Sequence, residues 1–233
     1  MKNLVTVFED TLEFSKELPM SFSSKHTFED IIERPTELSK DNITVINSDT
    51  VSALVEYSKI SKTCILNMAS DKKPGGGVKN GARAQEESLF RCSNLSKSIS
   101  NTLYPLNKNE CVYTKNSIFF KDFNYDYMES VECDVVTIAA INLNNYKDDD
   151  YYELTKDKIR LMLSLASKNG IKNIILGSWG CGVFDNNPSI ISGLFLHILH
   201  KERYSSLFDN VVFAIINDHN SVDNNYEIFK SQL

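Results

Sequence analysis

Glycine is scarce in this chain and is concentrated in two short runs. The 233 residues include nine glycines, and seven of them form the two runs: Gly75, Gly76, Gly77 and Gly81, then Gly177, Gly180 and Gly182. Each run follows an apolar segment typical of a buried β-strand, at residues 63–68 and 174–176. Glycine can adopt positive φ and lets the backbone approach a ligand without a Cβ. We therefore expect two loops built from backbone.

Helix-like and strand-like segments alternate along most of the sequence. Apolar spacing predicts helices over residues 3–18, 84–103 and 154–168, and the caps Asp49 and Asn187-Pro188 predict two more, the second ending near His200. The predicted strands are 43–47, 63–68, 117–120, 135–140, 174–176 and 211–216. No proline- or glycine-rich linker separates two halves, which favours one α/β domain with helices on both faces of a mixed sheet. Ligands bind beyond the carboxyl ends of such strands, so both glycine runs are expected on one rim.

The composition excludes several classes of protein. Hydrophobic residues make up 42% and charged residues 24%, which is typical of a globular domain and not of a disordered chain. The net charge of −6 argues against an extended groove for nucleic acid, although backbone amides can still bind an anion. No segment approaches the ~18 apolar residues of a membrane span, and the acidic N-terminus is unlike a signal peptide.

Cysteine and histidine placement favours neither disulfides nor a metal site. The five cysteines are scattered, odd in number and without a CxxC motif, which favours a reduced, cytoplasmic setting. The four histidines, His26, His197, His200 and His219, show no metal-ligand pattern, and the pair at 197 and 200 is interpreted as helix surface. We expect no metal and no cofactor.

The first glycine run leads into two adjacent acids. Seven residues separate the triple glycine from Gln85, Glu86 and Glu87, which open a predicted helix. The segment is not a Walker loop, because no Gly-Lys-Ser/Thr follows, and it lacks the GxGxxG of a dinucleotide site. Consecutive helical residues point about 100° apart, so the two acids are expected to do different jobs. The alternative is that both acids only complement the positive end of the helix.

This spacing, GGG-x7-QEE, resembles the signature of poly(ADP-ribose) glycohydrolases, and specifically of their bacterial-type branch, which is a macrodomain. Residues 67–91 resemble the family's strand, loop and catalytic helix, and 177–184 (GSWGCGVF) resembles its phosphate loop. The segments VFEDTLEF and INSDTVSAL are similar to its N-terminal part. The resemblance implies a three-layer α/β/α fold with a central mixed sheet. Residues 1–233 would form a single domain, with 1–40 as an N-terminal helical extension.

The resemblance also implies an activity. The protein would hydrolyse ribose–ribose O-glycosidic bonds in poly(ADP-ribose), mainly from the chain end, and release ADP-ribose. Glu87 would be the general acid and base, and Glu86 would orient the ribose on the leaving-group side. A general acid needs a raised pKa, which an adjacent Glu86 carboxylate and a closed pocket favour and a helix N-terminus opposes. We expect a monomer.

The remaining site residues follow from the same resemblance. Asn67 would hydrogen-bond the distal ribose, Gln85 would hold the loop, and Phe184 would pack against the ribose. Backbone amides would approach the ribose and diphosphate at Gly75, Gly76, Gly77, Gly177, Gly180, Cys181, Gly182 and Val183. Cys181 is interpreted as a small loop residue and Trp179 as packing under the loop. The candidates for adenine stacking are Phe120, Phe123 and Tyr125.

Two other functions stay open at this stage. The same Glu87 could remove a single ADP-ribose from a protein side chain or a nucleic-acid base. A module that binds ADP-ribose or a related NAD-derived nucleotide without turnover is the third interpretation. It is disfavoured because a pure binding module has no use for a glutamate at the anomeric carbon.

Overall fold

The central strands bury side chains on both of their faces. In the computed structural model, which describes residues 2–216 and 224–233, Cys64 and Leu66 of β3 (Thr63–Met68) belong to one hydrophobic cluster and Ile65 to the other. Strands β6 (Asn173–Leu176) and β7 (Asn210–Ala214) divide their residues in the same way. Burial on both sides explains why these strands are continuous apolar runs in the sequence.

Seven strands form one mixed sheet. The other strands are β1 (Phe22–Thr27), β2 (Ile43–Ile46), β4 (Glu110–Lys121) and β5 (Tyr127–Ile138), and the order across the sheet is β1-β4-β5-β3-β6-β7-β2. Strands β5, β3, β6, β7 and β2 run parallel, while β1 and β4 are antiparallel to their neighbours. Because β3 and β6 are parallel neighbours, the two glycine runs that follow them lie on the same rim, as expected.

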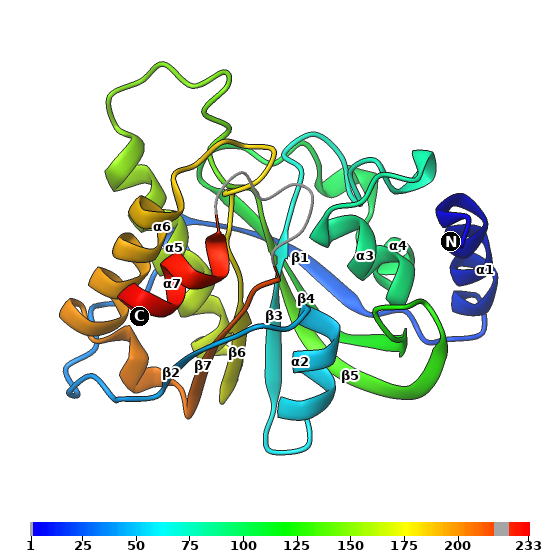
Figure 1. The fold of residues 1–233 in the computed structure, drawn as a ribbon, viewed down its shortest axis with the longest axis horizontal. Helices are drawn as coiled ribbons and strands as arrows, with labels where there is room; N and C mark the ends of the chain where they lie inside the picture. Colours follow the sequence, from blue (N-terminus) through cyan, green and yellow to red (C-terminus); the bar gives the residue numbers. More distant parts are fainter. Residues whose placement is uncertain (1, 217–223) are drawn as a thin grey trace.

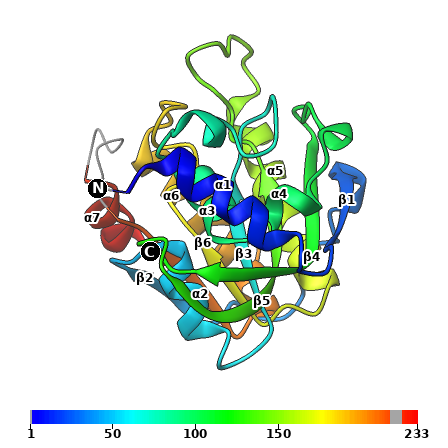
Figure 2. The same ribbon diagram turned by 90° about the vertical axis from the view of Figure 1, so that its right-hand side faces the viewer.

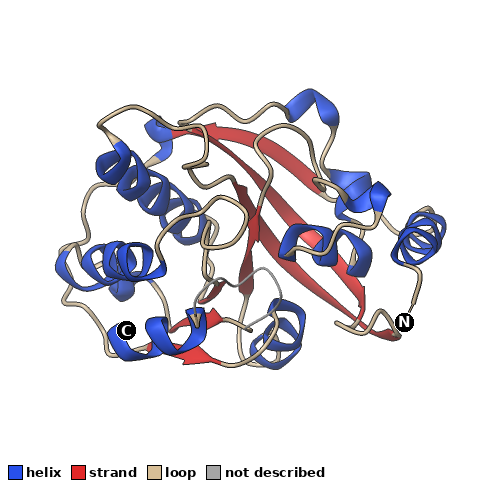
Figure 3. Ribbon diagram, turned by 45° about the horizontal axis from the view of Figure 1, so that its top comes forward, coloured by secondary structure: helices blue, strands red, loops and turns tan. Residues whose placement is uncertain are grey.

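Helices cover both faces of the sheet (Figures 1 and 3). One layer contains α2 (Thr50–Tyr57), α3 (Gln85–Cys92) and α4 (Leu95–Ser98), and α1 (Leu4–Ser15) crosses the outer side of α3 and α4 (Figure 2). The opposite layer contains α5 (Tyr151–Lys168), α6 (Pro188–Leu196) and α7 (Asn225–Gln232). This confirms the predicted three-layer α/β/α fold with a mixed sheet. Among the described helices, none is both long and apolar enough to cross a membrane.

The predicted helix over residues 84–103 is wrong in its second half. Helix α3 ends at Cys92, because Ser93 is extended and forms an isolated bridge with Phe119 of β4. Asn94 continues this link: its N–H donates to the Ile118 carbonyl, and its Oδ1 accepts from the Ile118 N–H. Pairing with β4 therefore replaces the helical hydrogen bonds that the apolar spacing predicts. The remainder forms the short α4 and a 3-10 turn, Asn101–Leu103.

The N-terminal segment is also not a purely helical extension. Only Leu4–Ser15 and the 3-10 turn Phe28–Asp30 are helical, while residues 22–27 form β1 at one edge of the sheet. The sequence FSSKHT gives little sign of this strand, because an edge strand that is half-buried needs no apolar alternation. Strands β4 and β5 are also longer than predicted, and the last predicted helix ends in a π-helical turn, His197–Lys201.

Candidate active site

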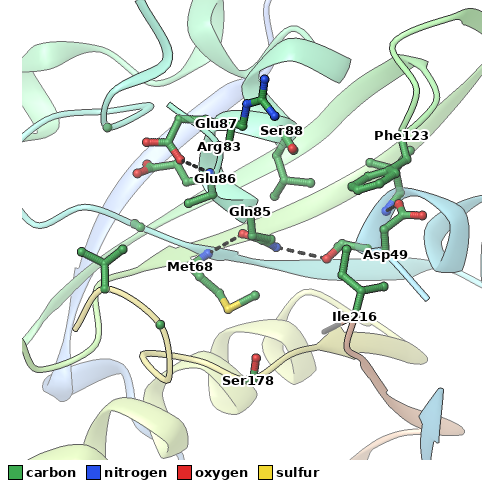
Figure 4. Close-up of a pocket in the computed structure, with 18 of the residues that line it drawn as sticks. Asp49, Met68, Arg83, Gln85, Glu86, Glu87, Ser88, Phe123, Ser178 and Ile216 are labelled. Carbon is green, nitrogen blue, oxygen red and sulfur yellow. Dashed lines mark hydrogen bonds between the residues drawn. The ribbon is translucent and has the colours of Figure 1, made fainter. Parts of the chain in front are cut away.

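A cleft lies at the carboxyl ends of β3, β6 and β7, with a cavity volume of about 1010 Å³. The first glycine run contributes Gly76 and Gly77 to its wall, and the second contributes Gly180, Gly182, Val183 and Phe184. Gln85, Glu86 and Glu87 line it from the first turn of α3 (Figure 4). The structure thus brings the second glycine run, which begins 90 residues after Glu87, to the first run and both acids.

Two backbone amides hold the Glu87 carboxylate. The Gly77 N–H donates to Oε1 (2.8 Å) and the Ala84 N–H donates to Oε2 (3.1 Å). Gly77 directly precedes the seven-residue spacer, and Ala84 is the last residue of the spacer. The two ends of the spacer therefore hold the two oxygens of this carboxylate. The side chain is buried, with 7% of its surface exposed. The spacing between the glycines and the acids is therefore what fixes the orientation of Glu87.

Glu86 is held by a different pair of amides. The Ser70 N–H donates to its Oε2 (2.8 Å) and the Gly75 N–H donates to its Oε1 (3.1 Å). Burial raises the pKa of Glu86 to about 8, and the nearby charge of Glu87 adds to the effect, while the two amides and the Asn67 side chain oppose it. Glu86, the neighbour of the expected general acid, thus has a raised pKa.

Gly76 is the point on which both carboxylates converge. Its φ is +49°, and a Cβ there would lie 2.6 Å from Oε1 of Glu87 and 3.0 Å from Oε2 of Glu86. Gly75 also has positive φ, and a Cβ there would meet the Phe90 ring at 2.7 Å. Glycine is required at both positions by conformation and by space.

Gln85 joins the rim of the sheet to α2. Its Nε2 donates to the Leu66 carbonyl (2.6 Å) and to Oγ1 of Thr50 (3.2 Å), and its Oε1 accepts from the Met68 N–H (2.9 Å) (Figure 4). These contacts fix the start of α3 against the end of β3. The side chain therefore holds this loop in place, as the resemblance implies.

Asn67 lies behind the cleft and does not line it. Its side chain is fully buried, Nδ2 donates to Oγ1 of Thr137 (3.3 Å), and Oδ1 has no hydrogen-bond partner among the described residues. The expected contact between Asn67 and a ribose stays a prediction. The Asn67 side chain also lowers the pKa of Glu86 slightly against the effect of burial.

The second glycine run forms a tight turn over the sheet. Gly180 has a φ of +79°, and a Cβ there would lie 2.6 Å from the Ala140 Cβ. The Trp179 ring is buried below the loop and its Nε1 donates to the Ile138 carbonyl (3.0 Å), which confirms the packing role. Gly177 and Cys181 do not line the cleft, and the Cys181 thiol is free and buried. Val183 is the most exposed residue of the loop, at 71%.

Sequence reasoning missed two residues that hold the loops. Asn186 donates from Nδ2 to the carbonyls of Ile141, Gly180 and Phe184, and so closes the second run. Arg91 is fully buried, and its guanidinium donates to two carbonyls of the spacer, Val78 and Ala82, and to the Leu4 carbonyl of α1. Neither residue has a signal in the sequence beyond its closeness to a motif.

The far end of the cleft contains two of the three aromatic candidates. Phe123 and Tyr125, from the turn between β4 and β5, line the cleft. Phe120 does not, because it packs against Phe14 with ring centroids 4.5 Å apart. Among the described residues, no group of three or more His, Cys, Asp or Glu side chains is placed to hold a metal ion. His219 lies outside the described residues.

The fold and this paired-carboxylate cleft define a macrodomain-like α/β/α protein, and comparison with known families specifies which one. Residues 6–123 match the family described as "Microbial-type PARG, catalytic domain". The match spans half of the sequence, and the chain belongs to this family. No curated protein matches the chain.

Solved structures show the same fold. Poly(ADP-ribose) glycohydrolase from Thermomonospora curvata has a TM-score of 0.87 at 21% identity, and its complex with the inhibitor ADP-HPD has 0.85 at 22%. Both alignments cover 99% of each chain. The enzyme from Deinococcus radiodurans in complex with ADP-ribose has a TM-score of 0.79 at 22% identity, over 100% of this chain and 97% of that one.

Proposed function

We propose that this protein hydrolyses ribose–ribose O-glycosidic bonds in poly(ADP-ribose), mainly from the chain end, and releases ADP-ribose. The observation that carries the proposal is the convergence of Glu86 and Glu87 on Gly76 inside a cleft built by both glycine runs. A cavity of about 1010 Å³ is large enough for a dinucleotide-sized ligand. The family membership and the ADP-ribose bound by the Deinococcus enzyme support this ligand class.

Glu87 is the proposed catalytic residue. It would protonate the leaving oxygen at the anomeric carbon and then take a proton from the attacking water. Its two amide contacts fix the carboxylate in one orientation. Burial raises the pKa of its neighbour Glu86 to about 8, so Glu86 holds a proton near neutral pH beside the proposed acid.

The other residues are proposed to bind the substrate. Amides of the second glycine run would hold the diphosphate, since the segment from Gly177 to Phe184 contains no basic side chain. Phe184 lines the cleft and would pack against the distal ribose. Glu86 would orient the ribose on the leaving-group side, and Asn67 would hydrogen-bond the distal ribose.

We further propose that the chain acts as a single-domain monomer in the cytoplasm. The strands of the one sheet come from residues 22–214, which supports a single domain. All five cysteines are free and buried in this structure, which supports a reducing compartment.

The test compares the protein with Glu87→Gln on three substrates: poly(ADP-ribose), mono-ADP-ribosylated protein and mono-ADP-ribosylated DNA. We expect ADP-ribose release from the polymer and a loss of about 100-fold or more in the variant. The control is Glu56→Gln, which removes an exposed carboxylate of α2 outside the cleft and leaves the rate unchanged. Retained turnover in Glu87→Gln would sink the assignment. Turnover of a mono-ADP-ribosyl substrate alone would indicate the second function, and ADP-ribose binding without any turnover would indicate a binding module.

A further inference from the structure

A buried amide group without a partner lines the cleft. Asn225 is the first residue of α7, and only 3% of its surface is exposed. Several buried side-chain atoms lack a hydrogen-bond partner among the described residues, and Oδ1 of Asn225 is the one that belongs to a cleft-lining residue. This oxygen does not cap α7, because it accepts from no amide of the helix. A buried carbonyl oxygen in this state is stabilised by a ligand that brings a donor.

Asn225 belongs to the part of the cleft at the end of β7. Phe229, which follows one helical turn later on the same face of α7, packs against Phe213 of β7 with ring centroids 5.6 Å apart. The face of α7 that carries Asn225 is therefore the face that packs on β7. Ile215 and Ile216, which follow the end of this strand, also line the cleft.

This end of the cleft lies away from the two acids. The carboxylates of Glu86 and Glu87 are held by amides of the loop after β3, and β6 separates β3 from β7 in the sheet. In Figure 4, Phe123 and Ile216 lie on one side of Gln85, and the two acids lie on the other. The Phe123 side chain is 39% exposed, so its ring is accessible to a ligand. One end of the cleft thus holds the acids, and the other combines aromatic and aliphatic side chains with a buried amide.

The second end suits the base of an ADP-ribose unit. By the proposed function, the distal ribose lies at the acids and the diphosphate lies at the second glycine run, so the nucleobase occupies the opposite end. A base stacks on an aromatic ring through its flat face and leaves its polar edge for other partners. The edge of adenine places an amino donor beside a ring-nitrogen acceptor, and an asparagine amide matches this pair with one acceptor and one donor.

We propose that Asn225 determines the base specificity of the site, with Oδ1 accepting a hydrogen bond from the 6-amino group of the bound adenine. This inference rests on the proposed function and adds the base to the substrate that it names. Asn225 lies outside residues 6–123, the segment that matches the family, so the family match does not assign it. A base without the amino group leaves Oδ1 buried and without a donor, which is the physical basis of the selectivity.

The test measures binding of two probes by calorimetry: ADP-ribose, and the analogue in which hydrogen replaces the 6-amino group. One such hydrogen bond makes the wild type bind ADP-ribose about tenfold more tightly than the analogue. Asn225→Leu should bind both probes equally, within about twofold, whereas Asn225→Asp keeps an acceptor at the same place and should keep the preference. The matched control is Asn145→Leu, which removes an exposed amide outside the cleft and should keep the wild-type preference.

Kinetics on poly(ADP-ribose) give a second measurement. Asn225→Leu should raise KM about tenfold and leave kcat nearly unchanged, because the base is remote from the scissile bond and contributes equally to ground-state and transition-state binding.

Three results would overturn the inference: equal affinity of the wild type for both probes, a preference that persists in Asn225→Leu, or a preference that Asn145→Leu also loses. If Asn225→Leu does not fold, Asn225→Asp decides, and a folded Asp variant without the preference would overturn the inference as well. A wild type that shows the preference but releases no ADP-ribose from polymer would instead contradict the proposed function and support the base contact.

Discussion

At the scale of single residues, the site depends on a position where a side chain has no room. The Gly76 backbone lies against two carboxylates, with Oε1 of Glu87 only 2.6 Å from where a Cβ would be. Gly81 offers a close comparison, because its φ of +77° is equally unfavourable for other residues but its Cβ would meet only ordinary contacts at 3.7 Å or more. An alanine at either position strains the backbone, but only an alanine at Gly76 also crowds the carboxylates. Comparing the two variants therefore distinguishes the two effects.

We therefore expect Gly76→Ala to lower kcat by about 100-fold, because the added methyl displaces the Glu87 carboxylate by a fraction of an ångström or more. Gly81→Ala should lose about 1 kcal/mol of stability through strain, as Gly76→Ala also does, but keep nearly full activity. Steady-state kinetics and urea unfolding of both variants measure the two effects. Equal activities would contradict the close-approach argument.

At the scale of elements, Arg91 connects the catalytic loop, α1 and α3. Its Nη2 donates to the carbonyls of Ala82 (2.7 Å) and Val78 (3.3 Å), and its Nε donates to the Leu4 carbonyl (3.2 Å). The guanidinium thus ties down the spacer whose two ends hold Glu87. The guanidinium donates from two separate nitrogens of a rigid plane, whereas the donors of a lysine all leave from one nitrogen, so a lysine here would not reach the same three carbonyls.

Arg91→Lys should destabilise the fold by about 3 kcal/mol, because about two charged hydrogen bonds are lost. It should also lower kcat, since the Gly77 and Ala84 amides are no longer fixed. Arg160→Lys is the control: Arg160 forms partly exposed ion pairs with Asp157 and Glu202, so about 1 kcal/mol or less is expected, with kcat unchanged. Urea unfolding measures the loss of stability, and steady-state kinetics measure kcat. A stable but inactive Arg91→Lys would contradict the predicted stabilising role of Arg91.

At the scale of the whole molecule, burial of Glu86 in the cleft makes the free energy of unfolding depend on pH. The layers around the rim leave only 3% of the Glu86 surface exposed, and its pKa rises from 4.5 to about 8. Between these values the folded protein binds a proton that the unfolded chain has already released. Stability from this group is therefore fully present below about pH 4.5, falls as the pH rises toward 8, and changes no further above it.

The stability of the wild type should thus decrease from pH 5 to pH 8 by at most about 1.4 kcal/mol per pH unit from this group. Glu86→Gln removes the titration and should flatten the slope, whatever its effect on absolute stability. Urea unfolding at pH 5, 6, 7 and 8 measures the slopes, with Glu56→Gln as the control that keeps the wild-type slope. An unchanged slope in Glu86→Gln would mean that Glu86 is ionised in the folded protein.

Local patterns predicted much of this structure because local chemistry controls those parts. The strands 63–68 and 174–176, the Asp49 cap and the Asn187-Pro188 start all appear close to their predicted positions. The break after Cys92 and the edge strand β1 escaped prediction for the opposite reason. Both depend on hydrogen bonds to β4, which is distant in sequence and leaves no periodic signal in residues 22–27 or 93–94.

The sequence alone determined which residues could form a site: two scarce glycine runs after buried strands, and a fixed spacer before two acids. Those features act over a few residues, through backbone freedom and strand periodicity, and so they can be detected without a structure. Only the tertiary structure decided how the acids differ. Burial and the nearby charge of Glu87 raise the pKa of Glu86, and the packing of the loops sets which side chains line the cleft. These are properties of a three-dimensional environment, because desolvation depends on everything that surrounds a group and not on its neighbours in the chain.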